Sequence, residues 1–225
     1  MNSQYQAFDE QMRKCRKCEA LFAKYPVDPR KSDIYTIPRP IISGIRHKPV
    51  MLIGQAPGIT EYETGKPFQG DAGQGIRSIF DEIGLPRSRF DELVYSSAVI
   101  KCFPGSKHAL RSGKAREDVL PSAEMIHNCQ PFLEGQIKLA DPNIIVTLGG
   151  LPLKAYLKLT GRKASEARLE NFVGHQERWN GRTVIFFPHT SGASYWLNSP
   201  DNRRLFQQGK ALLRTEFIER GITTP

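Results

Sequence analysis

The chain has 225 residues, and 32 Lys and Arg stand against 23 Asp and Glu, which sets the formal net charge at +9. Hydrophobic residues make up 39% of the chain, which is enough for a core and excludes a disordered protein. No apolar run approaches the ~20 residues that span a bilayer, so we expect no membrane association. The basic balance either serves solubility alone or indicates an anionic partner, most commonly nucleic acid.

The first thirty residues mix charged and apolar side chains without the apolar stretch of a secretory signal, so we expect a cytoplasmic protein. Disulfides are rare in that compartment. Cys15 and Cys18 form a C-x-x-C pair, whereas Cys102 and Cys129 stand alone. Four cysteines in this pattern predict a metal site, either zinc or an iron–sulfur cluster. The wide separation of the second two favours the cluster.

Short apolar runs alternate with amphipathic segments along the rest of the chain. The predicted strands cover 50–53, 94–100, 144–148 and 184–187. The predicted helices cover 75–83, 122–140, 151–159 and 203–218. This alternation predicts an α/β fold, with a mostly parallel sheet covered on both faces. We expect one domain over residues 1–225, in which 1–49 form a helix carrying the C-x-x-C and a wrap, and 50–225 form the core.

A loop rich in Gly, Pro or polar residues follows each predicted strand. These loops are 54–58, 102–114, 149–150 and 188–192. Because parallel sheets bind ligands at the carboxyl ends of their strands, we expect the loops to form one site. The spacing of the glycines excludes a P-loop and a dinucleotide fingerprint. His189, just beyond the fourth strand, could polarise a carbonyl or donate to a developing anion.

The segment 101–116 is basic and has the composition of a loop. It is either a solvated surface loop or a contact to DNA phosphates, and we favour the DNA contact. The candidate residues are Lys107, His108 and Arg111.

Five motifs, met in order, resemble those of the uracil-DNA glycosylase superfamily, most closely its iron–sulfur branches, family 4 and family 5. They are G-Q-A-P-G, T-G-K-P-F-Q-G-D-A-G, S-A-V-I-K-C, P-N-I-I-V-T-L-G and H-T-S-G-A-S. The resemblance covers about residues 12–215. It implies a three-layer α/β/α sandwich around a four-stranded parallel sheet. It also implies a monomer that flips uracil, or another deaminated base, out of DNA and hydrolyses its N-glycosidic bond.

The resemblance assigns roles to named positions. The base pocket would contain Gly54, Gln55, Ala56, Phe68, Ala98 and His189. The contacts to DNA would include Ser191 and three candidates for a wedge inserted into the duplex, Tyr195, Trp196 and Leu197. A 4Fe-4S cluster, with zinc as the alternative, would be held by Cys15, Cys18, Cys102 and Cys129.

The position of the catalytic carboxylate differs between family 4 and family 5. Family 4 typically has Glu at the position of Gln55, and an amide cannot act as a base. Family 5 lacks that acid too and relies on an Asp that matches Asp71. We therefore expect Asp71 to activate water or to stabilise the cationic sugar, with Glu61 and Glu63 as reserves, while His189 stabilises the departing base.

Two further positions bear on specificity and mechanism. Ala98 stands where family 4 has an Asn that reads the Watson–Crick edge of uracil, so we expect weaker rejection of other bases. In a related subgroup, a His from an inserted loop captures the sugar covalently, and His108 lies in the comparable region without the surrounding motif. A non-catalytic or covalently capturing protein that binds damaged DNA is therefore the alternative to a glycosylase.

Overall fold

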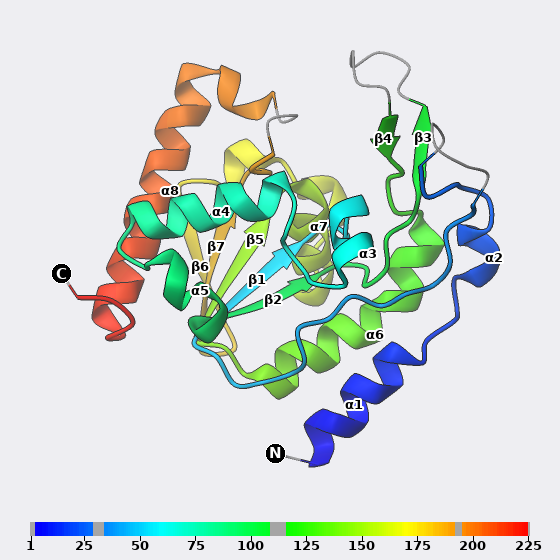
Figure 1. Cartoon of the computed structure of the whole chain (residues 1–225). Coiled ribbons are helices and arrows are strands. Elements are labelled where there is room, and N and C mark those ends of the chain that lie inside the picture. The colour runs from blue at the N-terminus through cyan, green and yellow to red at the C-terminus, as the bar shows by residue number, and fades with distance from the viewer. Residues whose placement is uncertain (1–2, 29–33, 109–115, 192–194, 225) are drawn as a thin grey trace.

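The structure is a computed structural model, and it describes residues 3–28, 34–108, 116–191 and 195–224. At its centre lies a five-stranded sheet with the order β2-β1-β5-β7-β6 (Figure 1). The strands are β1 (Val50–Gly54), β2 (Val94–Ala98), β5 (Ile144–Leu148), β6 (Gln176–Trp179) and β7 (Arg182–Phe187). Four of them, β2, β1, β5 and β7, are parallel, which confirms the predicted parallel sheet.

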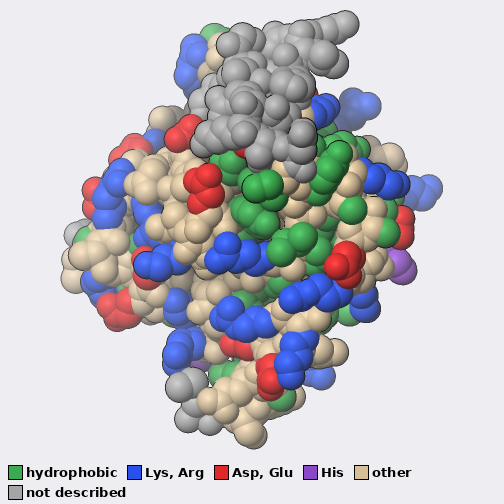
Figure 2. All heavy atoms as spheres, turned by 45° about the vertical axis from the view of Figure 1, so that its right-hand side comes forward, with side chains coloured by type: hydrophobic (Ala, Val, Ile, Leu, Met, Phe, Trp, Pro, Cys, Tyr) green, Lys and Arg blue, Asp and Glu red, His purple; other side chains and the backbone are tan. Residues whose placement is uncertain are grey.

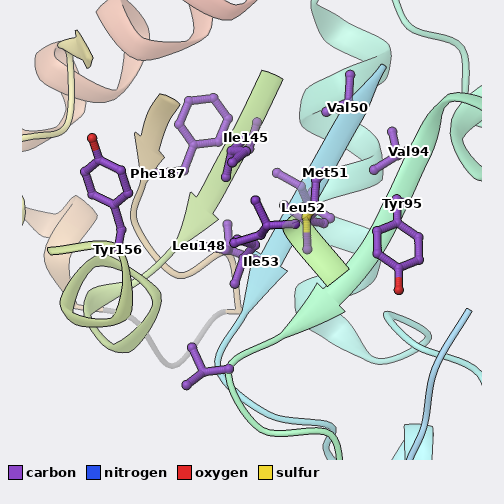
Figure 3. Close-up of a cluster of buried hydrophobic side chains, with 14 of the residues drawn as sticks. Val50, Met51, Leu52, Ile53, Val94, Tyr95, Ile145, Leu148, Tyr156 and Phe187 are labelled. Atoms are coloured by element: carbon purple, nitrogen blue, oxygen red, sulfur yellow. The ribbon is translucent and has the colours of Figure 1, made fainter. Parts of the chain in front are cut away.

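The parallel strands are apolar because both faces of the sheet are covered. Every residue of β1 and of β5 is buried. Val50 pairs with Val94 on one side and with Ile144 on the other, so β1 is an interior strand. Figure 3 shows the side chains of β1 among those of its neighbours, with Tyr95 on β2 and Ile145 on β5.

Two groups of helices cover the sheet. The helices of the core are α3 (Ile59–Thr64), α4 (Asp71–Glu82), α5 (Arg87–Leu93), α6 (Ala123–Ala140), α7 (Gly150–Leu159) and α8 (Pro200–Glu219). Phe80 of α4 contacts Phe90 of α5 and Phe217 of α8, at centroid distances of 5.3 and 5.6 Å, so these helices share one face. Helices α6 and α7 together line a small apolar cavity against β1 and β5, on the other face. The predicted three-layer architecture is therefore confirmed.

The amino-terminal segment differs from the prediction. Helix α1 (Ser3–Arg13) ends before Cys15, and Cys18 precedes the short helix α2 (Glu19–Phe22). The expectation that one helix carries the C-x-x-C is wrong, because the N–H of Cys15 bonds to the carbonyl of Met12, only three residues back. Such a tight turn ends a helix. The two thiols therefore lie at a bend between α1 and α2.

Two hairpins were not predicted. The edge strand β6 is joined to β7 by Asn180 and Gly181, both with positive φ. Asn-Gly is the strongest short signal for a hairpin, and it was present in the sequence. The segment 101–116, expected as a loop, contains β3 (Ser106–His108), which pairs with β4 (Arg116–Asp118). Within the described residues, none of the helices is both long and apolar enough to pass through a membrane.

Candidate functional site

A cavity of about 760 Å³ lies at the carboxyl edge of the parallel strands, and we call it the sheet-edge cavity. The ends of β1, β2 and β5 line it, as do the loop after β7 and the start of α4. The predicted site residues in its wall are Gly54, Gln55, Ala56, Phe68, Asp71, Ala98, His189, Ser191 and Tyr195. Two of the four predicted loops, 54–58 and 188–192, line this cavity as expected from the sequence, whereas 149–150 and the described residues of 102–114 do not.

Phe68 crosses the end of β1, and two glycines allow this. A Cβ on Gly54 would lie 2.8 Å from Cζ of the Phe68 ring, and one on Gly73 would lie 2.0 Å from the Phe68 carbonyl oxygen. Any larger side chain at either position would displace the ring or its backbone. Phe68 itself has a φ of 54°, a conformation that is uncommon for a bulky residue and is held only by its surroundings.

Glu61 joins the two loops on either side of this ring. Its Oε1 accepts hydrogen bonds from the backbone N–H groups of Gln69 and Gly70, both at 2.8 Å, and its Oε2 accepts one from Gly58 at 2.9 Å. The side chain is buried, with 9% of the residue exposed. Three backbone donors on one buried carboxylate favour a positioning role over the reserve role in water activation. Glu63, the other reserve, is exposed on α3 and is absent from the cavity wall.

Asp71 is the first residue of α4, which begins four residues earlier than predicted. The side chain is exposed to the sheet-edge cavity. Gly70 precedes the helix, and its N–H is held by Glu61. The bonds of Glu61 therefore determine where α4 begins and where the Asp71 carboxylate lies.

His189 follows β7 and is half-buried in the opposite wall. The backbone N–H of Ser191 donates to Nδ1 of His189 at 3.3 Å, and the Ser191 hydroxyl lies 2.8 Å from the same atom. An Nδ1 that accepts these bonds leaves the ring proton on Nε2. Burial lowers the pKa of His189, which favours the neutral ring. The hydrogen bonds and the burial of His189 thus both favour a neutral imidazole with its N–H on Nε2.

The loop that carries His189 packs against α4 and is hydrogen-bonded to it. The Thr190 hydroxyl donates to the carbonyl of Ala72 at 2.8 Å, and a Cβ on Gly75 would lie 2.8 Å from the Thr190 carbonyl oxygen. Because α4 and this loop are in contact, Asp71 and His189 are held by one packed unit.

The three wedge candidates lie in different surroundings. Tyr195 is 79% exposed and also lines the cavity. Trp196 and Leu197 pack partly against the core, and the indole N–H of Trp196 is 3.3 Å from Oε1 of Glu170. Of the three, Tyr195 is the side chain placed at the mouth of the cavity.

Two basic side chains of the segment 101–116 lie within the described part of the chain. Lys101 is buried, with 3% exposed, and Lys107 is paired with Glu117 at 3.0 Å. Arg111 and the side chain of His108 lie outside the described part of the chain. Figure 2 shows Lys and Arg side chains spread over the face that comes forward from the right of Figure 1, with acidic side chains among them.

All four cysteines line one small pocket, which we call the cysteine pocket. Cys15 and Cys18 come from the bend after α1, Cys102 follows β2, and Cys129 lies on α6. None of the four is in a disulfide. Cys15 is half-buried and the other three are buried. The structure therefore brings together thiols that are up to 114 residues apart (129 − 15).

The electrostatics of the cysteine pocket fit a cationic metal cluster. Burial raises the pKa of Cys102 and of Cys129, and neighbouring thiols raise both further, while Lys101 acts in the opposite direction on Cys129. Four thiolates could share this pocket only with compensating positive charge, which iron supplies. In the described residues, no three His, Cys, Asp or Glu side chains are placed to hold a single metal ion. A 4Fe-4S cluster does not need that arrangement, because it takes its four thiolates at separate irons.

The fold and the cavity define a class: an α/β protein with a polar ligand site at the carboxyl edge of its sheet. The family model for the uracil DNA glycosylase superfamily matches residues 43–212. The chain therefore belongs to the uracil-DNA glycosylase superfamily, as its motifs indicated.

Named relatives lie in two branches of that superfamily. The type-4 uracil-DNA glycosylase of Saccharolobus solfataricus is 27% identical over 95% of this chain and 87% of its own. That of Pyrobaculum aerophilum is 33% identical over 52% of each chain. The type-5 enzyme of the same organism is 30% identical over 50% of this chain and 49% of its own. The match to the Pyrobaculum relatives thus spans about half of their length.

Proposed function

We propose that this protein is a monofunctional glycosylase that removes uracil from DNA by hydrolysing the N-glycosidic bond. One observation carries the proposal. In a chain of this superfamily, the sheet-edge cavity brings Phe68, Asp71 and a neutral His189 together. These are an aromatic platform, a carboxylate and a hydrogen-bond donor, which are the groups that release of an anionic base requires.

The reaction divides between the two walls of the cavity. The flipped base stacks on Phe68, and Nε2–H of His189 donates to the carbonyl beside the leaving nitrogen. As the C1′–N bond breaks, its electron pair leaves with the base, so the base becomes an anion and the sugar a cation. Water then attacks C1′, and Asp71 orients it and accepts its proton. That proton passes through solvent to the base, so the products are free uracil and an abasic site.

The neutral state of His189 matters for this step. A neutral donor stabilises the departing anion without first taking a proton from solvent, and burial favours that state. Gln55, at the end of β1, has no carboxylate, and it lines the same cavity. Its side chain and the backbone around Ala56 would bind the base, while Asp71 acts on the water.

The mouth of the cavity would meet the DNA. Tyr195 is the wedge that we favour, because it is exposed and lines the cavity. Ser191 would contact the strand from the same loop. Ala98 leaves one wall without an amide for the Watson–Crick edge of uracil, so hypoxanthine and xanthine are further candidate bases.

A 4Fe-4S cluster would be bound by the four cysteines and would act structurally, joining α1, α6 and the segment after β2. The chemistry that such a cluster supplies elsewhere is electron transfer, and base hydrolysis needs none. What this chain's residues do in the reaction is confined to the sheet-edge cavity.

The test is incubation of the purified protein with uracil-containing oligonucleotides, followed by alkaline cleavage at abasic sites. We expect alkali-dependent cleavage of uracil substrates and none of a thymine control. If no product forms from uracil, hypoxanthine or xanthine, the protein is not a glycosylase for these bases. Tight binding to abasic DNA without base release would then support the second function, a non-catalytic sensor of damaged DNA, which the absence of an acid at Gln55 permits.

A further inference from the structure

A chain of buried hydrogen bonds joins the end of β2 to helix α6. Tyr95 and Ser97 are two residues apart in β2, so their side chains point to the same face of the sheet. On that face both meet Gln136, whose Nε2 donates to the Tyr95 oxygen at 2.7 Å and whose Oε1 accepts from the Ser97 hydroxyl at 2.8 Å. All three residues are buried, with at most 6% exposed. The orientation of the Gln136 amide thus determines the direction of the Ser97 bond.

Lys101 reaches Ser97 from the segment that follows β2. Its ammonium donates to the Ser97 oxygen at 3.2 Å and also to the carbonyl of Ala98. An ammonium group carries protons and no lone pair, so it can only donate. The Ser97 oxygen must therefore accept on this side, while its own proton is directed to Gln136.

The hydrogen-bonding capacity of Ser97 is thus nearly used. A hydroxyl has one proton and two lone pairs. Among the described residues, its proton is donated to Gln136 and one lone pair accepts from Lys101. One lone pair remains for a molecule in the sheet-edge cavity, which Ser97 lines. Ser97 therefore offers an acceptor to that molecule and no donor.

The position of Ser97 suits the edge of a flipped base. Ser97 and Ala98 are the residues of β2 that line the sheet-edge cavity, and of the two only Ser97 has a polar side chain. In the register of the sheet, Ala98 lies beside Gly54, the residue against which the tip of the Phe68 ring packs. A base that stacks on Phe68 would therefore lie at this end of β2, where Ser97 can accept a hydrogen bond from it.

An acceptor at this place distinguishes deaminated bases from their parents. Cytosine and adenine have a ring nitrogen with a lone pair next to their amino group. Deamination replaces that amino group by a carbonyl and puts a proton on the ring nitrogen, which gives N3–H in uracil and N1–H in hypoxanthine. The Ser97 lone pair would bind either N–H, whereas the lone pair of cytosine or adenine would be left without a donor. Thymine and guanine carry the same N–H, so other contacts must exclude them.

We propose that Ser97 is a specificity-determining residue, which accepts a hydrogen bond from the ring N–H that deamination creates. The inference rests on the proposed function and narrows its substrate class to bases with such an N–H. Gln136 and Lys101 act through Ser97, because they occupy its proton and one lone pair and so leave an acceptor rather than a donor. The hydroxyl of Ser97 then takes the place of the amide that is missing at the neighbouring Ala98.

The experiment measures base release from two substrates that differ at N3. An oligonucleotide carrying either deoxyuridine or N3-methyldeoxyuridine, which has no N3–H, is mixed with excess full-length protein, and single-turnover rates are recorded. The variants are Ser97→Ala, which removes the acceptor, and Ser97→Thr, which keeps it. Ser96→Ala is the matched control, because Ser96 is similarly buried (5% against 6% exposed) but lies on the opposite face of β2 and outside the cavity wall. Thermal unfolding and visible absorption confirm that each variant is folded.

For Ser97→Ala we expect uracil release to slow about tenfold, because one hydrogen bond to the base is lost. Release of N3-methyluracil should not slow, since that base has no N–H to donate and the smaller side chain leaves room for its methyl group. The ratio of the two rates should therefore narrow about tenfold or more. Ser97→Thr and Ser96→Ala should keep the wild-type ratio within about twofold. If Ser97→Ala does not fold, Ser97→Cys, a weaker acceptor of similar size, gives the same comparison.

Two results would overturn the inference. An equal slowing of both substrates in Ser97→Ala would mean that Ser97 has a structural role or donates to a carbonyl of the base. Release of N3-methyluracil by neither the wild type nor Ser97→Ala would mean that another group reads N3.

The two proposals fail separately. If the wild-type protein releases no uracil, the proposed function is wrong, and the inference falls with it. If the wild type releases uracil and Ser97→Ala does so equally fast, only the role of Ser97 is wrong.

Discussion

The sheet-edge cavity and the cysteine pocket lie close together near the end of β2, yet they differ in volume, polarity and access to solvent. The cavity has a volume of about 760 Å³ and contains Asp71, His189 and other polar groups within reach of solvent. The cysteine pocket is small, and three of its four thiols are buried. An open polar cavity suits a substrate that enters and leaves, whereas a closed pocket of thiols suits a permanent ligand. The first region is thus expected to govern rate and the second stability.

Lys101 connects the two regions. It is buried, and its ammonium donates to the Ser97 hydroxyl at 3.2 Å and to the carbonyl of Ala98. Both partners lie at the end of β2, in the wall of the sheet-edge cavity. Burial lowers the pKa of Lys101 to about 8, while Cys129 and Cys102 act in the opposite direction. The Lys101 ammonium therefore interacts both with the thiols of the cysteine pocket and with the end of β2 that lines the sheet-edge cavity.

The largest effect is expected in the cysteine pocket, where Cys102→Ala removes one of the four proposed ligands of the cluster. We expect loss of the bound cluster and a fall of about 10 °C or more in the midpoint of thermal unfolding. Iron analysis, visible absorption and calorimetry measure these changes. A variant that stays folded and fully active without iron would contradict a structural role, and a colourless wild type containing zinc would replace the cluster by the alternative metal.

In the cavity, His189→Ala and Asp71→Asn should affect rate with little effect on stability. We expect each to lower the single-turnover rate of uracil release by about 100-fold or more, because each removes a group that interacts with the transition state. The Kd for uncleavable DNA and the unfolding midpoint should stay near wild type. Wild-type rates in both variants would remove these residues from the mechanism.

Glu61 is expected to affect both stability and rate, because its hydrogen bonds hold two loops of the sheet-edge cavity together. In Glu61→Gln, the side-chain NH₂ would face the N–H of one of its three backbone partners, so one strong bond is replaced by a clash of donors. We expect a loss of about 2 kcal/mol in the free energy of unfolding. We also expect a roughly tenfold slower release, since Phe68 and Asp71 lose their fixed positions. Glu63→Gln, on the exposed side of α3, is the matched control and should change neither.

The smallest effect concerns His189 and pH. Its pKa is lowered by burial from the usual value of about 6.5, so the neutral ring already dominates at neutral pH. Lowering the pH from about 8 to about 7 should therefore leave the rate of uracil release nearly unchanged. A rate that rises as the pH falls would mean that the imidazolium is the active form.

The same shift contributes to stability with a definite sign. The unfolded chain binds a proton at His189 near pH 6.5, and the folded chain binds it only at lower pH. Stability should therefore fall as the pH drops from the unfolded pKa toward the folded one. In His189→Ala that part of the decline is expected to vanish, which unfolding experiments across this range would measure.

Much of the fold followed from local pattern. The strands at 50–53 and 144–148 were found because residues buried on both faces must be apolar. The helix expected over 122–140 begins where predicted, because Ser122 is a favoured N-cap residue and its hydroxyl accepts a hydrogen bond from the N–H of Met125. The strand β6 was missed although Asn180-Gly181 marks its turn, since it is only four residues long and three of them are polar.

The site was predicted less completely, for a different reason. The motifs pointed to Phe68, Asp71 and His189; Asp71 begins a helix, His189 lies just beyond a strand, and Phe68 lies in the loop before α4. The hairpin could not be read in this way, because its place depends on contacts with the amino-terminal segment, such as that between Ser106 and Pro26. Composition made the segment 101–116 look like a basic contact to DNA, whereas packing buried Lys101 and brought Asp118, two residues beyond the segment, into the cavity wall.

The sequence by itself determined the α/β class, the order of the parallel strands along the chain, the four cysteines and the family. Each of these depends on residue type and short-range spacing. Only the tertiary structure decided that four distant cysteines share a pocket, that Glu61 joins two loops, and that the hairpin supplies carboxylates to the cavity. These features depend on which distant segments pack together, and the free energy of that packing belongs to the whole fold rather than to any local stretch.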